Sequence, residues 1–204
     1  YELLFRDGQQ NCFPNNVDPD EATSKLITGT HLAFGVEEIT FGKPAFINFH
    51  TDTLLYRFPT SLNPQDILVE IVETVEVNEE MVAACKHIHG LGYRIVLDDH
   101  DFDAKWSPIL PFVSFVKVDI ESIDIQIIKK HMPAMKKAGF KMIAERVETS
   151  DQLTLCIELG FDYFQGYFFA KPEVMRNKNI PSSKLVMLEL MHATSEKCFD
   201  FDDV

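Results

Sequence analysis

Charged side chains close two apolar, β-branched runs in the middle of the chain. The run at 93–97 is followed by Asp98 and Asp99, and the run at 112–118 carries Lys117 and is followed by Asp119. Such runs, bounded by turn residues, are typical of buried strands in a parallel sheet. Unpaired buried charge is costly, and α/β folds place their chemistry at the C-terminal ends of parallel strands. The two runs therefore predict a functional site at one end of a sheet.

The same pattern recurs along the chain, because polar residues close other predicted strands as well. The predicted strands are 1–5, 45–49, 67–71, 93–97, 112–118, 140–144 and 161–164. The polar residues carried by these strands or their ends are Glu2, Asn48, Glu70, Asp98 with Asp99, Lys117, Glu145 with Glu148, and Gln165. If the strands form one barrel, all these side chains project into a single mouth.

Helix patterns lie between the predicted strands. We predict helices at 18–34, 79–90, 121–138 and 150–160. Strand and helix alternate after residue 44, which predicts an α/β fold of parallel βαβ units. Short strands fit a TIM-like (β/α) barrel, although an open doubly wound sheet would give a similar pattern. With 204 residues and 46% hydrophobic content, the chain can form one domain of this size, or one domain plus a fragment.

Several carboxylates that converge on one site would repel one another, and divalent cations are the usual remedy. A shell of oxygen ligands selects Mg²⁺ or Mn²⁺ over zinc. A pair of such ions can clamp the attacking and leaving oxygens of a phosphodiester, and Lys117 could orient the attacking water or offset phosphate charge. A lone Glu at a strand end is more often a solvated surface charge or a helix cap, so the interpretation depends on the whole series.

Composition excludes some classes of function. The net charge of -13 argues against duplex nucleic acid as a partner, and an anionic ligand would need metal ions or local Arg and Lys. No apolar run reaches the length of a membrane span. The four cysteines have no CxxC spacing, which is typical of a reduced, cytoplasmic protein rather than of a disulfide framework or zinc site. Neither common phosphate-loop signature follows any strand.

Taken in order, these motifs resemble those of the EAL family of cyclic di-GMP phosphodiesterases. Glu2-Leu3-Leu4 with Arg6 resembles the family signature E-A/L-L-x-R, Asn48 resembles the Asn of its VNLS-like strand end, and Glu70 with Glu73 resembles its ExxE motif. Asp98-Asp99 resembles the start of its DDFG motif, and Lys117-Val118-Asp119 resembles its KID motif. The run at 145–149 resembles its EGVET motif, and Gln165-Gly166-Tyr167 with Lys171-Pro172 resembles its QGYxxxKP motif. The resemblance covers residues 1 to about 175, and seven motifs in the same order make it specific.

The resemblance implies a TIM-like barrel of the EAL type that hydrolyses cyclic di-GMP to linear pGpG with Mg²⁺ or Mn²⁺, in bacterial second-messenger signalling. It implies six metal ligands, which are Glu2, Asn48, Glu70, Asp98, Asp99 and Glu145. It gives Lys117 the hydrolytic water and places Glu145, Glu148 and Gln165 with it in the catalytic site. Arg6 and Leu4 would meet the substrate, and Glu73 would anchor the loop after Asp99. A cytoplasmic homodimer is a further expectation.

The chain departs from the family at two loops. The family's DDFGTGYSS is DDHDFDAKW here, so that His100 and Asp101 replace the usual Phe and Gly, and Arg146 stands where EGVE has Gly. The family's usual first strand is also absent, so the barrel is expected to lack one strand. The altered loop predicts slow hydrolysis. The alternatives are a catalytically impaired cyclic di-GMP receptor and a protein-interaction scaffold.

The abbreviated pattern is similar to the EAL half of EAL–HDOD proteins. We therefore expect residues 1–175 to form the barrel and residues 176–204 to be a linker and the start of a truncated, helical HDOD-like domain. An amphipathic helix over 185–191, capped by 181–184, supports this boundary. The alternative is an acidic C-terminus with no partner domain.

Overall fold

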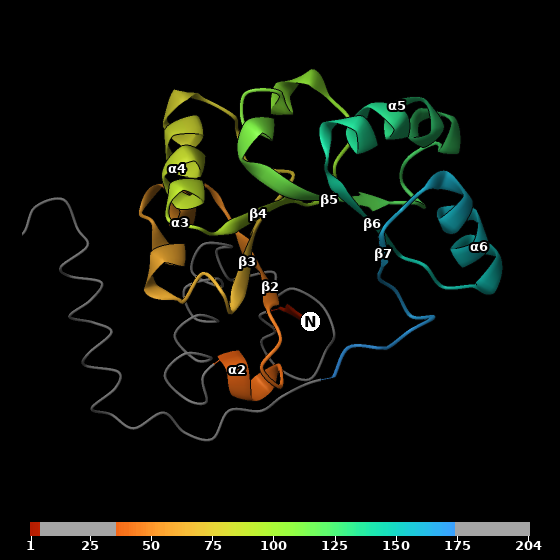
Figure 1. The fold of residues 1–204 in the computed structure, drawn as a ribbon, viewed down its shortest axis with the longest axis horizontal. Helices are drawn as coiled ribbons and strands as arrows, with labels where there is room; N and C mark the ends of the chain where they lie inside the picture. Colours follow the sequence, from red (N-terminus) through yellow and green to blue (C-terminus); the bar gives the residue numbers. More distant parts are fainter. Residues whose placement is uncertain (5–35, 174–204) are drawn as a thin grey trace, which may run out of the picture.

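A computed structural model describes residues 1–4 and 36–173 (Figure 1). Seven parallel strands form one sheet in sequence order. The strands are β1 (Glu2–Leu3), β2 (Ala45–Phe49), β3 (Ile67–Ile71), β4 (Arg94–Leu97), β5 (Val113–Asp119), β6 (Lys141–Glu145) and β7 (Tyr163–Phe164). Each strand expected from the sequence is present.

The longer helices lie along the outer side of this sheet, whereas the short helix α2 (Val36–Ile39) lies below β2 in this view (Figure 1). The others are α3 (Thr51–Leu55), α4 (Glu79–Gly90), α5 (Ile125–Ala138) and α6 (Ser150–Leu159), with short 3₁₀ helices η1 (Phe58–Ser61), η2 (Ala104–Trp106) and η3 (Leu110–Phe112). Side chains of β2–β4 pack with α3 and α4 in one core, and side chains of β5 and β6 pack with α5 and α6 in a second.

The order of the strands decides between the two folds that the sequence left open. A doubly wound sheet reverses its strand order at a switch point, whereas this sheet runs from β1 to β7 without reversal. Its two edges approach each other, because Gln165 Nε2, just after β7, donates a hydrogen bond to Glu2 Oε2 of β1 at 2.5 Å. Among the described residues β1 and β7 share no backbone pairing. The sheet is thus a curled, TIM-like parallel sheet, as predicted.

Local side chains set where the helices begin. Asn78 Oδ1 accepts a hydrogen bond from Met81 N at 2.9 Å at the start of α4, and the Thr149 side chain caps α6. The prediction of a helix from residue 121 was wrong. Asp119 Oδ1 accepts the Glu121 N–H at 2.9 Å, which holds that segment in a turn, and α5 begins only after the N-cap Asp124.

Two connections contain more structure than their sequences indicated. The polar connection after β2 contains α3 and η1, and the segment between β4 and β5 contains η2 and η3. The predicted helix at 18–34, the segment 176–204 and Arg6 lie outside the described residues. Within the described ranges, Cys85 and Cys156 are buried and unbridged, and no helix is long and apolar enough to cross a membrane.

Candidate active site

Lys117 is the centre of the site. Its side chain is 1% exposed, and four carboxylates from different parts of the sheet surround its ammonium group. Nζ contacts Glu70 Oε1 directly and lies 2.8 Å from Glu145 Oε1, 3.2 Å from Asp98 Oδ1 and 3.7 Å from Glu2 Oε2. The structure thus brings together five of the residues that the sequence analysis singled out, from strands far apart in the chain.

The alternation of side chains along each strand explains this arrangement. Ile47, Ile71 and Val118 point outward into the helix-covered cores, so the neighbouring strand residues point to the concave side. Behind the charged groups on that side lies a row of aromatic rings from Phe46, Phe115 and Tyr163, with ring centroids 6.4 and 5.9 Å apart. Lys117 Nζ is 5.8 Å from the Phe46 ring. These rings therefore lie on the same side of the sheet as the central ammonium group.

The charges in this group are not balanced. Burial alone would lower the pKa of Lys117, but the surrounding carboxylates raise it well above its ordinary value, so the ammonium stays charged. Burial raises the pKa of Glu70 well above its ordinary value, and the attraction of Lys117 opposes this only in part. Burial, opposed by Lys117 and reinforced by Asp98, raises the pKa of Glu145 to about 8. One ammonium therefore does not compensate this cluster, which retains protons near neutral pH.

A second group of oxygens adjoins the first. Carboxylate oxygens of Glu73, Asp98 and Asp99 lie within 4.8 Å of one another, so Asp98 belongs to both groups. Burial, with repulsion from Asp98 and Glu73, raises the pKa of Asp99 to about 6. All the donors are oxygens and carry excess negative charge, which fits a hard divalent cation. Glu73, expected as a loop anchor, is thereby placed among the oxygens able to hold a metal.

The remaining predicted site residues have different surroundings. Asn48, at the end of β2, pairs in register with Glu70. Gln165 contacts Glu2 through the hydrogen bond described above. The backbone N–H of Glu148 donates to Gln152 Oε1 at 2.8 Å, and its exposed side chain makes no described contact with the carboxylates around Lys117. Leu4, just beyond β1, is 37% exposed.

The altered loop after Asp99 is packed through side chains. Asp101 Oδ1 accepts hydrogen bonds from Trp106 Nε1 at 2.9 Å and from Asp103 N at 3.0 Å. The His100 ring is 2% exposed and lies 5.2 Å from the Phe102 ring. Its backbone N–H donates to the Lys117 carbonyl at 2.9 Å, which ties the loop to the strand that carries the central lysine. Burial lowers the pKa of His100 to about 4, so the ring is neutral.

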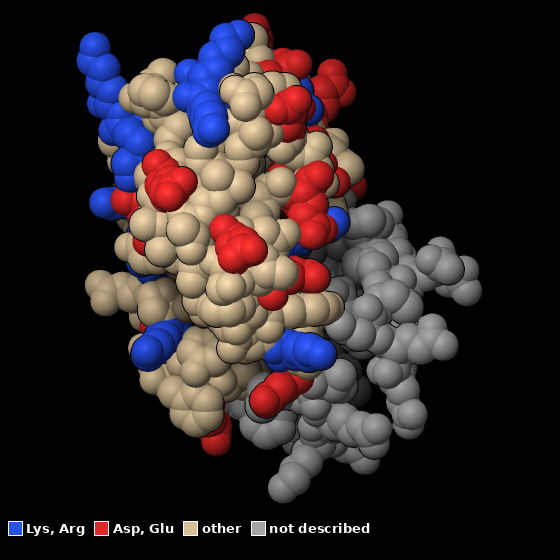
Figure 2. Space-filling view, turned by 90° about the vertical axis from the view of Figure 1, so that its right-hand side faces the viewer, with Lys and Arg blue, Asp and Glu red and all other residues tan. Residues whose placement is uncertain are grey.

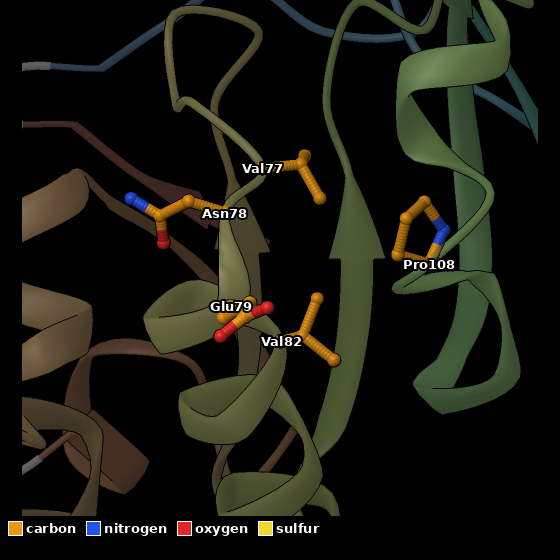
Figure 3. A pocket seen from close by; sticks show the side chains of 5 residues that line it. All are labelled: Val77, Asn78, Glu79, Val82 and Pro108. Carbon is orange, nitrogen blue, oxygen red and sulfur yellow. The ribbon is translucent and has the colours of Figure 1, made fainter.

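A surface pocket lies near the start of α4 (Figure 3) and shares no lining residue with the strand-end groups. It is lined by Val77, Asn78, Glu79, Val82 and Pro108, none of which is a predicted site residue. The candidate site is therefore defined by the convergence of charged groups around Lys117 and not by this pocket.

Three groups of contacts in the structure were not predicted from the sequence. The aromatic row could have been predicted from the alternation of Phe46, Phe115 and Tyr163 with outward-facing neighbours. The Asp101–Trp106 hydrogen bond has no signal in the sequence. Neither has an ion pair between Arg146 Nε and Asp119 Oδ2, 3.2 Å apart.

Comparison with known proteins gives the family. The model of the EAL domain matches residues 21–172, well over half of the chain. The chain therefore belongs to the EAL domain family. Glu2 precedes the matched range, yet the structure places it beside Lys117 and Gln165.

Two curated relatives match nearly the whole chain. It is 34% identical over 203 residues to the cyclic di-GMP phosphodiesterase CdgJ of Vibrio cholerae, covering 98% of this chain and 47% of that protein. It is 28% identical over 203 residues to the uncharacterized protein YuxH of Bacillus subtilis, covering 97% of this chain and 49% of that protein. The chain thus spans about half the length of these relatives.

Solved structures support the fold. Klebsiella pneumoniae BlrP1, in a complex with calcium and cyclic di-GMP, matches with a TM-score of 0.60 and 20% identity, over 78% of this chain and 46% of that one. Bacillus subtilis YkuI, which has an EAL domain and was solved with cyclic di-GMP and calcium, matches with a TM-score of 0.59 and 15% identity, over 90% of this chain and 51% of that one.

Proposed function

We propose that the chain carries a divalent-metal-dependent phosphodiesterase site that hydrolyses cyclic di-GMP to linear pGpG. The observation that carries this proposal is the convergence of four carboxylates on the buried Lys117. Membership of the EAL family supports the substrate, since relatives such as CdgJ are named cyclic di-GMP phosphodiesterases.

Mg²⁺ or Mn²⁺ is the metal that these residues fit. The proposed ligands are Glu2, Asn48, Glu70, Asp98, Asp99 and Glu145, with Glu73 close to the two aspartates. A divalent ion bound there would supply positive charge to the phosphodiester oxygens and lower the pKa of a coordinated water. Crowded carboxylates with raised pKa values favour such an ion, because it replaces their protons and relieves their mutual repulsion.

The side chains of the chain have distinct proposed tasks. Lys117, charged and fixed by its neighbours, holds the hydrolytic water and offsets the charge of the phosphate. Gln165 orients the Glu2 carboxylate through its 2.5 Å hydrogen bond. Glu148 supports the site from its exposed edge, and Leu4 and Arg6 meet the substrate. Glu145 completes the carboxylate set on the other side of Lys117.

For the full-length protein we propose a cytoplasmic bacterial signalling role. Residues 1–175 would form the phosphodiesterase domain, and residues 176–204 would begin a helical HDOD-like domain. A homodimer would be the working form. The length of the relatives, about twice the span matched here, is consistent with a further domain.

Turnover of cyclic di-GMP with Mn²⁺, followed as pGpG by chromatography, tests the proposal. We expect turnover that stops when a chelator is added and falls by at least about 100-fold in Glu2→Gln and Asp98→Asn. Lys141→Met is the control, because Lys141 is exposed at the opposite end of β6. Binding without turnover would make the protein a cyclic di-GMP receptor, and no binding would favour the scaffold.

A further inference from the structure

Arg146 has a backbone conformation that its side chain disfavours. It follows Glu145 directly at the end of β6, and its φ is +56°. A residue with a Cβ is strained in this left-handed region, where glycine is the usual choice. The EGVET motif has glycine at this position, so this chain carries an arginine where the backbone conformation favours glycine. We therefore expect the Arg146 side chain to form interactions that offset the backbone strain.

The guanidinium of Arg146 is held near the carboxylates that surround Lys117. Its Nε lies 3.2 Å from Asp119 Oδ2, and the Asp119 side chain is 4% exposed. Asp119 is fixed in turn, since its Oδ1 accepts the Glu121 N–H at 2.9 Å. Asp119 lies two residues after Lys117 on β5, on the same side of the strand, and pairs in register with Glu145. The ion pair thus holds Arg146 next to the Lys117–Glu145 contact.

The outer part of this guanidinium remains available to a ligand. The Arg146 side chain is 58% exposed, and its terminal nitrogens, Nη1 and Nη2, donate no hydrogen bond to the described residues. A planar guanidinium fixed through Nε presents two N–H donors at a spacing that matches two oxygens of a phosphate.

An anionic ligand of this protein needs an exposed cationic group close to the site. The chain has a net charge of -13, and the candidate site itself is rich in carboxylates. On the face that Figure 2 shows, acidic and basic side chains are interspersed, and the described residues there form no broad basic surface. Attraction of a phosphodiester to the site therefore depends on a bound metal and on cationic side chains close to it.

We propose that Arg146 binds the non-bridging oxygens of the substrate's phosphodiester through Nη1 and Nη2, with Asp119 as the residue that positions it. This assignment rests on the proposed function and adds a phosphate contact that the family motif, with glycine at this position, does not supply. It also accounts for an arginine in a left-handed conformation at the mouth of the site.

Steady-state kinetics of Arg146→Gln, Arg146→Gly and Arg146→Lys test this inference. We expect the Gln and Gly variants to raise KM for cyclic di-GMP by about five- to tenfold, with kcat within about threefold of wild type, because one partly exposed charge-assisted contact is lost. The Lys variant should lie between them and wild type. The control is Arg94→Gln, which removes the same charge at the N-terminal end of β4 and should leave KM unchanged. Mn²⁺ affinity, measured by calorimetry, should be the same in all five proteins.

A KM that stays at the wild-type value in both Arg146→Gln and Arg146→Gly would overturn the inference. A loss of Mn²⁺ affinity in these variants as large as their rise in KM would also overturn it. A second probe, bis(4-nitrophenyl) phosphate, carries a phosphodiester without guanine and separates this inference from the proposed substrate. Hydrolysis of this probe with an Arg146-dependent KM, but no action on cyclic di-GMP, would support the arginine contact and refute the substrate. Hydrolysis of neither by wild type would overturn both.

Discussion

Replacement of Lys117 by Met should destabilise the metal-free protein by about 3–5 kcal/mol at neutral pH. The aliphatic part of the side chain is kept, but the buried ammonium that contacts Glu70, Glu145 and Asp98 is lost. Breaking a buried ion pair is costly because the remaining charges stay uncompensated.

The distances set the scale of this effect. At 3.2 Å from Asp98, the attraction of the ammonium is worth about 5 kcal/mol before desolvation, at an effective dielectric constant of about 20, and Glu145 at 2.8 Å adds a similar attraction only where it is ionised. Proton uptake limits the penalty, since the pKa of Glu145 is already raised to about 8 and would rise further without Lys117. The loss should therefore shrink to about 1–2 kcal/mol at pH 5, where the carboxylates take up protons.

Urea unfolding of wild type and Lys117→Met at pH 5.0 and 7.5, with chelator or with Mn²⁺, measures these terms. Mn²⁺ should restore most of the lost stability, because a divalent cation supplies the missing charge. The matched control is Lys141→Met, whose exposed ammonium lies 3.8 Å from Asp162, and which should cost less than about 0.5 kcal/mol. A loss that is the same at both pH values and insensitive to Mn²⁺ would refute the reasoning, since it would mean that packing and not charge is what Lys117 contributes.

Three further predictions concern protons and backbone. The pKa of Glu145 is raised on folding, so its protonation stabilises the native state at acid pH, and this contribution is lost as the pH rises from about 4 towards 8. Urea unfolding of the metal-free protein should show a decline over this range that is smaller in Glu145→Gln, and an unchanged decline would count against the raised pKa. Mn²⁺ binding should release protons from Glu145 and Asp99, so the affinity for Mn²⁺ should rise between pH 6 and 8. Calorimetric binding heats that do not depend on the ionisation enthalpy of the buffer would contradict this release of protons. Gly166→Ala should cost more than about 2 kcal/mol, because the added Cβ would overlap backbone atoms of Val147, whereas Gly139→Ala, with φ +94° and open space, should cost about 1 kcal/mol; equal losses in thermal unfolding would count against the assigned overlap.

The central strands could be predicted from the sequence because each combines an apolar, β-branched run with turn residues around it. The alternation with helices predicted parallel βαβ units, but the strand order that separates a curled sheet from a doubly wound one is seen only in the structure. The start of α5 could not be predicted, because it depends on the turn that the Asp119 side chain holds. The helix α3 was missed, since its sequence, TDTLL, is short and begins in a polar segment.

The site could be predicted in part, since parallel strands bring their C-terminal ends together whatever the loops between them do. This placed Glu2, Glu70 and Glu145 near Lys117 without knowledge of distances. The loop contacts depend on three-dimensional packing that has no local signal. The hydrogen bond from Trp106 to Asp101, and the pairing of Arg146 with Asp119, are therefore visible only in the structure.

Diffraction from crystals soaked in Mn²⁺, recorded at the manganese absorption edge, tests the central claim most directly. We expect an anomalous manganese peak within ligand distance of Asp98 and Glu70, with the Lys117 ammonium moved away from its present contact with Glu70. No manganese at this cluster, at a concentration that supports hydrolysis of cyclic di-GMP, would refute the proposed metal site.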